Sequence, residues 1–307
     1  MTPIAICIVS FRDPEVIAGC LETLADSSFA DFEVIICENG GAQAHAELRE
    51  RLPASLPGGQ PLQIDLAPGN LGYAGGVNRC MQARPDARAW WVLNPDTRPQ
   101  PDALAALVRR LEQGDCAAVG GVLYHPDGKI QAYAGRWRAS LARPESIGHG
   151  ARLGDPIDAA AVERQTDYLL GASMLIGREM VARVGLMRED YFLYAEEVEW
   201  CLRAGRAGLK FGFAPDALVC HGQGATTGSA DAIGARPRMP IYLDERNKLN
   251  VVRDVTPGRL LTAIPASLLL SLLRFARRGA WRQQGYAIAG WWAGVRNRRG
   301  LPPWMAG

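Results

Sequence analysis

The chain has 307 residues, 48% of them hydrophobic and 21% charged, and its formal net charge is +2. These values describe a globular protein with a sizeable core, in one large domain or two ordinary ones, and they exclude a disordered chain. The charge is unevenly spread, because residues 255–307 contain eight arginines and no acidic residue. We therefore expect a mildly acidic body that carries a basic C-terminal segment.

Cysteine usage and the N-terminus favour a cytosolic protein. The seven cysteines are odd in number and scattered, and several lie inside apolar runs, as buried reduced thiols do. The N-terminal segment has no basic region, and its apolar run is too short for a signal peptide. We expect reduced thiols and no cleaved targeting segment.

Strands and helices are expected to alternate along the N-terminal part of the chain, which predicts an α/β fold with a mainly parallel, doubly wound sheet. Residues 133–167 contain several Gly and Pro residues and are expected to be irregular: a lid, a binding loop or a disordered segment. Continuous apolar runs predict strands at 4–9, 32–37, 62–66, 90–93 and 119–124, and periodicity predicts helices at 15–25, 44–52, 79–83 and 102–113.

The stretch 89–101 is central to this pattern. Asn94-Pro95-Asp96 stops the apolar run 90–93, because proline cannot continue a sheet ladder. In open α/β sheets ligands bind just beyond the carboxyl ends of the strands, so Asp96 stands where a site is expected. The alternative is an Asp that only forms a turn or caps the helix after Pro101.

Polar and glycine-rich segments follow two other expected strands, as a nucleotide site requires. Glu38 can accept hydrogen bonds from ribose hydroxyls or a base N–H, and Gly72, Gly75 and Gly76 let the backbone approach a ligand at a helix start. Neither G-x-G-x-x-G after the first strand nor a P-loop is present, which disfavours Rossmann oxidoreductases and P-loop enzymes. The alternatives are helix–strand packing for the glycines and a solvated turn acid for Glu38.

Several motifs, taken in order, resemble the family 2 glycosyltransferases of GT-A fold, specifically their bacterial rhamnosyltransferase-like branch. In the first half these are Val9-Ser10-Phe11, Glu38-Asn39, the segment 70–78 and Asn94-Pro95-Asp96. In the second half, residues 168–176 are similar to the acceptor-side strand and residues 191–203 to the acidic helix, while His221 and the segment 245–248 are similar to the family's later histidine and Arg-Asn elements.

The resemblance implies a GT-A domain at 1–254, with a nucleotide-sugar half at 1–118 and an acceptor and catalytic half at 119–254. The composition of residues 255–307 predicts a basic amphipathic helical tail after it. The resemblance also implies acceptor contacts at Gly171, Ala172 and Trp200, although Trp200 can instead pack in the core. The donor-binding residues that it implies are Ser10, Phe11, Glu38, Asn70, Gly72, Gly75, Asn78, Asn94, Asp96 and Arg246.

A divalent cation, Mg²⁺ or Mn²⁺, is expected with this chemistry. The diphosphate leaving group gains charge as the glycosidic bond breaks, and a hard cation held by carboxylates and phosphates neutralises it. The family usually carries Asp-x-Asp here, whereas this chain has Asn94 and Asp96. We expect Asp96 as a metal ligand with His221 completing the metal or diphosphate site; a structural histidine is the alternative.

The acidic helix supplies the candidate base. A helical wheel places Glu196, Glu199 and Arg203 on one charged face, with Glu199 and Arg203 spaced as an ion pair. Glu197 falls on the apolar side, where partial desolvation raises the pKa of a carboxyl group. We expect Glu197 to deprotonate the acceptor hydroxyl, with Glu196 as the fallback, although the family normally has Glu-Asp at these positions.

Two loops are open to functional roles. Arg136, Trp137 and Arg138 can touch a phosphate or a lipid head group, and residues 222–240 can form a mobile loop over the donor.

The apolar run 260–275 is shorter than the ~20 residues of a spanning helix and contains Pro265. With its arginines and tryptophans, the tail is expected to form a helix pair on an anionic membrane surface; packing on the domain or on a second subunit is the alternative.

The sequence therefore predicts an inverting, metal-dependent glycosyltransferase that moves rhamnose from dTDP-rhamnose to a glycan or polyprenyl-linked acceptor at the inner face of the cytoplasmic membrane, in surface polysaccharide synthesis. Donors linked to UDP or GDP, a nucleotidyltransferase, and a non-catalytic nucleotide-binding scaffold of the same fold are the alternatives. Nucleic acid is not an expected partner, since the apolar run has no role in that function. A homo-oligomer remains open.

Overall fold

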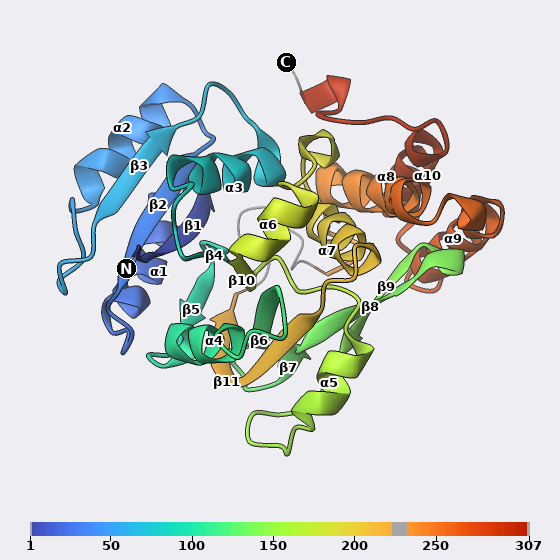
Figure 1. The fold of residues 1–307 in the computed structure, drawn as a ribbon. Coiled ribbons are helices and arrows are strands. Elements are labelled where there is room, and N and C mark those ends of the chain that lie inside the picture. Colours follow the sequence, from blue (N-terminus) through green and yellow to red (C-terminus); the bar gives the residue numbers. More distant parts are fainter. Residues whose placement is uncertain (1, 223–231, 306–307) are drawn as a thin grey trace.

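A computed structural model describes residues 2–222 and 232–305, which fold around a nine-stranded mixed sheet with helices on both faces (Figure 1). The strands are β1 (Ile4–Ser10), β2 (Phe32–Glu38), β3 (Leu62–Leu66), β4 (Ala89–Leu93), β5 (Thr97–Pro99), β6 (Ala118–Tyr124), β7 (Ile130–Ala132), β8 (Ala134–Arg138), β9 (Arg143–Ile147), β10 (Ser173–Gly177) and β11 (Phe211–His221). The helices are α1 (Pro14–Ala25), α2 (Ala42–Arg51), α3 (Gly72–Ala83), α4 (Ala103–Leu111), α5 (Ala159–Gln165), α6 (Arg178–Val184), α7 (Glu196–Arg206), α8 (Arg238–Val255), α9 (Leu260–Ala276) and α10 (Trp281–Val295).

The first four strands form the expected parallel sheet. The strand order is β3-β2-β1-β4-β10-β6-β11-β5, and β7 pairs with β6. β1, β2 and β4 are almost entirely buried and mostly apolar because helices cover both of their faces. Side chains such as Ala5 and Cys7 pack toward α3 and α7, whereas Ile6 and Ile8 pack toward α1 and α4. The carboxyl ends of β1, β2 and β4 consequently lie at one edge of the sheet.

The second half of the chain joins this sheet through β10. β10 is antiparallel to both β4 and β6, with Met174 opposite Val92 on one side and Gly120 on the other. The short strand β5, which the sequence did not predict, then pairs antiparallel with the end of β11 and sets Thr97 opposite His221. This pairing brings the segment after β4 next to the end of β11.

The expectation that residues 133–167 are irregular is wrong. β8 and β9 form a two-stranded hairpin, and α5 follows it. Pro144 is accommodated because the hairpin is a separate sheet with free edges. Trp137 is buried, and Arg138 pairs with Glu145 at 2.8 Å, so the hairpin is held by its own side chains.

The three C-terminal helices gather at one end of the molecule, beyond α7 (Figure 1). α10 crosses α8 so closely that a Cβ on Gly290 would lie 2.3 Å from Tyr242 O, and one on Gly294 would lie 2.7 Å from Arg246 O. Only glycine permits this approach. The seven cysteines are all unpaired and six of them are buried, as expected for reduced thiols.

The expected interruption of the apolar run at Pro265 does not occur. α9 continues through Pro265, and with the preceding turn it forms a 20-residue helical segment, Pro257–Ala276, that is long and apolar enough to cross a membrane, although only 22% of it is buried. Proline removes one backbone hydrogen bond, to Leu261, which is 88% exposed. The expectation that this segment is too short to span a membrane is therefore wrong.

Candidate active site

The ends of β1 and β2 are tied together by Glu38. Ser10 Oγ donates a hydrogen bond to Glu38 Oε2, and Glu38 Oε1 accepts from the backbone N–H groups of Gly40 at 2.5 Å and Arg12 at 3.2 Å. Asn39 N donates to Ser10 O at 2.9 Å. Glu38 is buried, so its carboxylate orders the two loop ends instead of facing a ligand as expected. Phe11, next to these loops, is exposed and available to stack on a ligand.

Gly72 allows the start of α3 to contact the loop before α7. Its φ is +70°, and a Cβ there would lie 2.1 Å from Phe192 O. Tyr73 N donates to the same carbonyl at 2.7 Å. Asn70 is exposed, and its Oδ1 accepts from Gly72 N at 3.0 Å. The glycine-rich segment therefore joins the donor half of the sheet to the acidic helix.

The side chain of Asn78 does not face a donor, which corrects the expectation for this residue, and Gly75 lies beside the same neighbouring segment. Asn78 Nδ2 donates to Met187 O and to Glu189 Oε1, both at 2.9 Å, and its Oδ1 accepts from Met187 N at 3.1 Å. A Cβ on Gly75 would lie 2.7 Å from Leu71 Cβ. Asn78 and Gly75 thus lie on the side of α3 that faces Met187 and Glu189, since Glu189 is also a neighbour of the Cβ added at Gly75.

Asp96 and His221 meet at the carboxyl edge, as the pairing of β5 with β11 requires. His221 Nε2 lies 3.3 Å from Asp96 Oδ1, and Gly222 N donates to Asp96 O at 2.9 Å. His221 Nδ1 donates to Gln131 Oε1 at 2.9 Å, while Gln131 Nε2 donates to His221 O at 2.7 Å. Since an amide oxygen only accepts, the neutral imidazole carries its proton on Nδ1 and turns the lone pair of Nε2 toward Asp96.

This pair fits a hard divalent cation. His221 Nε2 is buried and has no hydrogen-bond partner among the described residues, and the same holds for Asn94 Oδ1. Adjacent ligands of an octahedral Mg²⁺ lie about 3 Å apart, close to the spacing of Asp96 and His221. No group of three or more His, Cys, Asp or Glu suited to a metal occurs in residues 2–222 and 232–305. The cation would therefore need donor phosphates as further ligands.

The acidic helix α7 differs from its expected orientation. Glu199 pairs with Arg203 at 2.8 Å as predicted, but Glu196 and Glu199 are both buried, so the face that they share is not solvated. The helical wheel missed this because α6 and the segment after it pack against α7, where Arg203 donates to Val184 O and Leu186 O. Glu197 keeps partial exposure.

Both Glu196 and Glu197 have raised pKa values. Burial raises the pKa of Glu197 to about 7, with a smaller contribution from the charge of Asp244, while backbone N–H groups at the helix start oppose the shift. Burial, followed by the charge of Glu197, raises the pKa of Glu196 well above its usual value. Glu196 Oε2 has no hydrogen-bond partner in the described part of the chain. At neutral pH Glu197 is therefore poised to exchange a proton.

Tyr73 lies near both the acidic helix and Asp96. Its hydroxyl donates to Gly171 O at 2.6 Å. The pKa of Tyr73 is raised well above its usual value by burial first, and then by the charges of Glu196, Glu197 and Asp96. A Cβ on Gly171 would lie 3.5 Å from Glu197 Cγ, so Gly171 borders the candidate base as expected of an acceptor-side residue. These contacts place one site between β4 and α7.

The loop before α7 has a strained backbone, and a side chain of α8 stabilises it. Phe192, Tyr194 and Ala195 all have positive φ, between 67° and 73°, a conformation that residues other than glycine seldom adopt. Asn247 Nδ2, on α8, donates to the carbonyl oxygens of Tyr191, Leu193 and Tyr194 at 2.7–3.0 Å. The side chain of Asn247 thus fixes the conformation that positions Glu196 and Glu197.

Arg246 and Trp200 were expected to contact ligands, but both side chains are buried. Arg246 is 1% exposed and donates to Asn247 Oδ1, Gly300 O and Tyr191 O, so it supports the loop and does not contact a donor. Burial lowers the pKa of its guanidinium to about 10. Trp200 is fully buried and donates to Gly185 O at 2.8 Å, which excludes direct stacking on an acceptor sugar.

Other expected positions lie near the site or outside the described residues. Ala172 is buried, and its carbonyl accepts from Asn94 N at 3.0 Å. Of the expected loop 222–240, residues 223–231 lie outside the described residues. Sequence reasoning missed Gln131, Asn247 and Tyr73 as site residues; Tyr73 and Asn247 fall inside the segments that carry the resemblance, whereas Gln131 had no local signal.

An acidic helix and the pair of Asp96 and His221 lie at one edge of an α/β sheet. This arrangement agrees with the family comparison. The model described as glycosyltransferase like family 2 matches residues 2–238. The chain belongs to glycosyltransferase family 2. The expected family and enzyme class are thereby confirmed.

Two curated proteins are similar in sequence to this family 2 glycosyltransferase. The N-acetylglucosaminyl-diphospho-decaprenol L-rhamnosyltransferase of Mycobacterium tuberculosis is 32% identical over 182 residues, 52% of this chain and 58% of that protein, so the match spans little more than half of the relative. The low-salt glycan biosynthesis hexosyltransferase Agl10 of Haloferax volcanii is 25% identical over 246 residues, 77% of this chain and 76% of that protein.

Solved structures confirm the GT-A fold of this family 2 glycosyltransferase. A mannosyltransferase from Pyrobaculum calidifontis in complex with GDP-Man and Mn²⁺ has a TM-score of 0.56 at 15% identity, covering 96% of this chain and 87% of that one. GalNAc-T7 with UDP, GalNAc and Mn²⁺ has a TM-score of 0.58 at 12% identity, covering 81% and 51%. At these identities the likeness concerns the fold alone.

Proposed function

We propose that this glycosyltransferase moves L-rhamnose from dTDP-rhamnose to a glycan acceptor carried on a polyprenyl diphosphate, with inversion at the sugar and with Mg²⁺ or Mn²⁺. The observation that carries the proposal is the position of Tyr73, which lies within electrostatic reach of Asp96 and of Glu196 and Glu197. A group that can hold the donor diphosphate and a group that can deprotonate an acceptor are thus brought to one site.

The residues divide the chemistry between two ends of that site. Asp96 and His221 would hold the cation, which neutralises the charge that develops on the nucleoside diphosphate. Glu197 removes the proton from the attacking hydroxyl, and its pKa of about 7 suits a base at neutral pH. Burial and the neighbouring charge of Glu197 raise the pKa of Glu196, which disfavours a second negative charge in the site. A single displacement assisted by one base inverts the anomeric carbon.

The donor and acceptor are supported by the relatives. The mycobacterial relative is named as an L-rhamnosyltransferase acting on a diphospho-decaprenol carrier. A lipid-linked acceptor also suits α9, because the exposed side of this helix carries leucines. Every fourth residue from Ala263 to Phe275 is buried, while Leu261, Leu269 and Leu273 are exposed.

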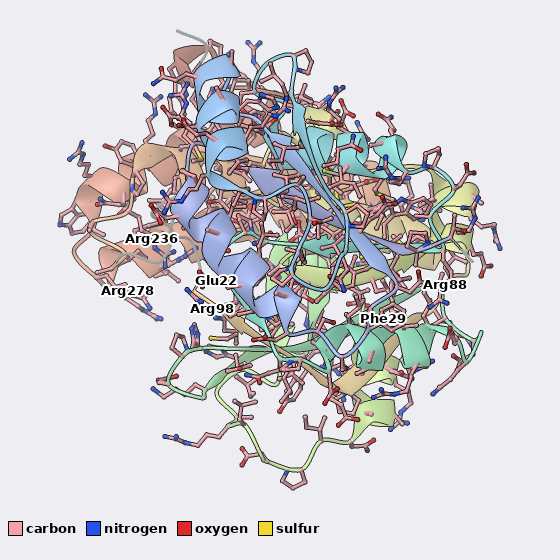
Figure 2. All side chains as sticks on the ribbon, turned by 90° about the vertical axis from the view of Figure 1, so that its left-hand side faces the viewer. Glu22, Phe29, Arg88, Arg98, Arg236 and Arg278 are labelled. Atoms are coloured by element: carbon pink, nitrogen blue, oxygen red, sulfur yellow. The ribbon has the colours of Figure 1, made fainter. Side chains whose placement is uncertain are left out.

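The tail is therefore proposed to rest on an anionic membrane, which places the enzyme at the cytoplasmic face as a peripheral protein. Small residues of α9 face the domain and leucines face outward, the reverse of an ordinary surface helix. Arg277, Arg278 and Trp281 follow α9 and are exposed, and Arg278 projects from the outer side of the C-terminal helices (Figure 2). An exposed surface that carries arginines and tryptophan and has no acidic residue is typical of a helix in the membrane interface.

The proposed function is tested by transfer to a diphosphate-linked N-acetylglucosamine lipid, offered with dTDP-rhamnose and with UDP- and GDP-sugars. Rhamnosylation that requires Mg²⁺ or Mn²⁺ and is lost in Asp96→Asn is expected. Transfer from a UDP- or GDP-sugar alone would refute the donor while keeping the enzyme class. Binding of nucleotide without turnover in any mixture would favour a non-catalytic scaffold.

A further inference from the structure

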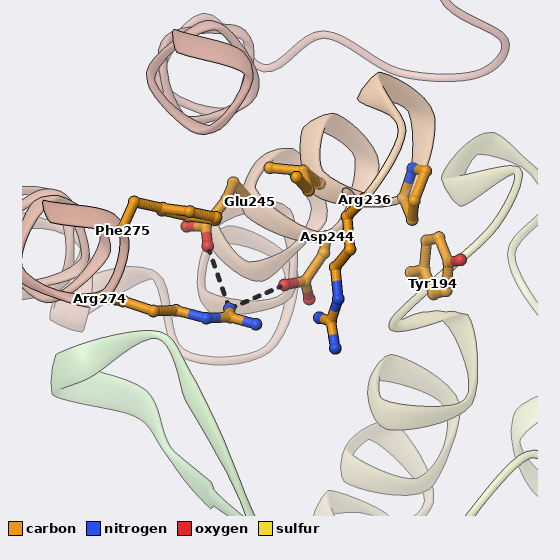
Figure 3. A pocket seen from close by; sticks show the side chains of 8 residues that line it. Tyr194, Arg236, Asp244, Glu245, Arg274 and Phe275 are labelled. Atoms are coloured by element: carbon orange, nitrogen blue, oxygen red, sulfur yellow. Dashed lines mark ion pairs between the residues drawn. The ribbon is translucent and has the colours of Figure 1, made fainter. Parts of the chain in front are cut away.

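A pocket of about 230 Å³ lies between the entry loop of α7 and the C-terminal helices. It is separate from the Asp96 and His221 pair, since neither residue lines it. Its wall combines acidic and basic side chains with an aromatic ring (Figure 3). The residues that matter here are Tyr194 before α7, Arg236 before α8, Asp244 and Glu245 on α8, and Arg274 and Phe275 on α9.

Lys248 pairs with both acids of the pocket from behind. Lys248 lies 2.6 Å from Asp244 and 3.0 Å from Glu245, whereas Arg274 lies 3.9 Å and 3.8 Å from the same two carboxylates. Arg274 is thus outside hydrogen-bond distance of both, and Arg236 extends into the same space (Figure 3). Lys248, Arg274 and Arg236 outnumber the two carboxylates by one positive charge, and the two arginines line the pocket.

The pocket lies between the candidate base and the apolar face of α9. On one side, the charge of Asp244 contributes to the raised pKa of Glu197, and Tyr194 is two residues before the first residue of α7. On the other side, Arg274 follows Leu273 in the exposed leucine row of α9. A molecule that reached from Glu197 to the apolar surface would therefore pass the two arginines.

We propose that this pocket binds the diphosphate of the lipid-linked acceptor. Planar guanidinium groups bind phosphate oxygens with paired hydrogen bonds, so Arg274 and Arg236 would grip the diphosphate. The saccharide then extends toward Glu197, and the hydrocarbon chain follows Leu273 and Leu269 to the membrane. The diphosphate is not broken in this step, since the new bond forms on the saccharide. This inference rests on the proposed function and names the part of the acceptor that the chain recognises.

The test compares two acceptors with the same short alkyl chain: one carries N-acetylglucosamine through a diphosphate, the other is the uncharged glycoside. In Arg274→Gln, the KM for the diphosphate acceptor is expected to rise about tenfold or more, with kcat unchanged and with no change in KM for the glycoside. The fold should persist, because half-exposed ion pairs near 4 Å stabilise little. Arg109→Gln, an exposed arginine on α4, is the matched control.

Binding of the diphosphate acceptor without donor, measured by calorimetry, separates this inference from the proposed function. If the native enzyme transfers sugar to neither acceptor, the proposed function fails, while weaker binding in Arg274→Gln still supports the pocket. If transfer occurs and neither Arg274→Gln nor Arg236→Gln changes KM or affinity, the inference is overturned. An equal loss with both acceptors would also overturn it, since the arginines would then act on the whole enzyme.

Discussion

His221 Nε2 faces Asp96 Oδ1 across 3.3 Å without a hydrogen bond, and Gln131 fixes the imidazole from the other side. With a proton on Nδ1, the neutral tautomer presents the lone pair of Nε2 to Asp96, and a cation between the two residues would bind both atoms. A carboxylate and a neutral imidazole are suitable ligands for Mg²⁺ or Mn²⁺. Gln131 would act as the outer partner that orients a metal-bound histidine.

His221→Ala and Asp96→Asn should each reduce the metal-dependent binding of dTDP. The expected result is a thermal shift with dTDP and Mn²⁺ that is smaller in either variant and unchanged when Mn²⁺ is left out. Gln131→Ala should weaken the metal effect about 10- to 100-fold, because the imidazole loses its orientation. A shift that needs no metal in the unaltered protein would contradict this assignment.

Glu197 should govern the pH dependence of turnover. Its pKa is raised to about 7 in the folded protein, so the deprotonated base is present above that pH and is lost as the pH falls through it. The acceptor kcat/KM is expected to rise with pH across this range and then level off. Glu197→Gln should lower kcat by roughly 10² to 10⁴ with donor binding intact. Full activity in this variant would remove Glu197 from the mechanism.

Gly72→Ala should destabilise the protein. The new Cβ would meet Phe192 O at 2.1 Å, and the φ of +70° disfavours alanine. We expect the free energy of unfolding to fall by about 2 kcal/mol or more, visible as a lower Tm. Gly69→Ala is the matched control: no atom lies within 4 Å of its added Cβ, and its effect should stay within about 0.5 kcal/mol.

Asn247→Ala should lower both stability and kcat. It removes three hydrogen bonds to the carbonyls of the strained loop before Glu196, and leaving buried groups unpaired costs about 1–3 kcal/mol. Asn250→Ala is the control, because Asn250 lies on the same helix but donates to Arg298 O in the tail. A similar drop in Tm for both variants, with kcat reduced only by Asn247→Ala, is the expected result. Equal kcat values would show that the loop holds its conformation without Asn247.

Leu269→Glu combined with Leu273→Glu should reduce sedimentation with anionic liposomes. Both leucines are exposed on the outward row of α9, so folding should not suffer. Raising the salt concentration should weaken the binding that remains, since the arginine contribution is screened. Leu153→Glu, which changes an exposed leucine outside the tail, is the control. Unchanged sedimentation of the double variant would refute the membrane surface.

The sequence predicted the parallel sheet, the family and the ends of strands that carry polar residues. Local apolar runs decide these features, as in β1 and β4. It did not predict the hairpin β8–β9 or the burial of Glu196, because both depend on packing between segments distant in sequence. The wheel placed Glu196 correctly relative to Glu199 but contained no information about which helices cover that face.

The same limit explains the residues whose roles changed. Asn78, Arg246 and Glu38 occur in the expected motifs, yet their polar atoms bind backbone or side-chain groups of neighbouring segments. A motif identifies a residue type at a position, whereas the direction of its side chain depends on the tertiary contacts. Burial separated these supporting residues from those left open to a ligand.

The end of the chain and the catalytic loop share a contact that matters for how the tail is tested. Gly300 N donates to Asp190 O at 2.6 Å, and Gly300 O accepts from Arg246, which also donates to Tyr191 O. A protein shortened before α9 would lose both the proposed membrane surface and the brace that Gly300 gives the loop. Loss of activity after truncation would then be ambiguous, so point substitutions on the outer face of α9 are the cleaner way to separate membrane attachment from catalysis.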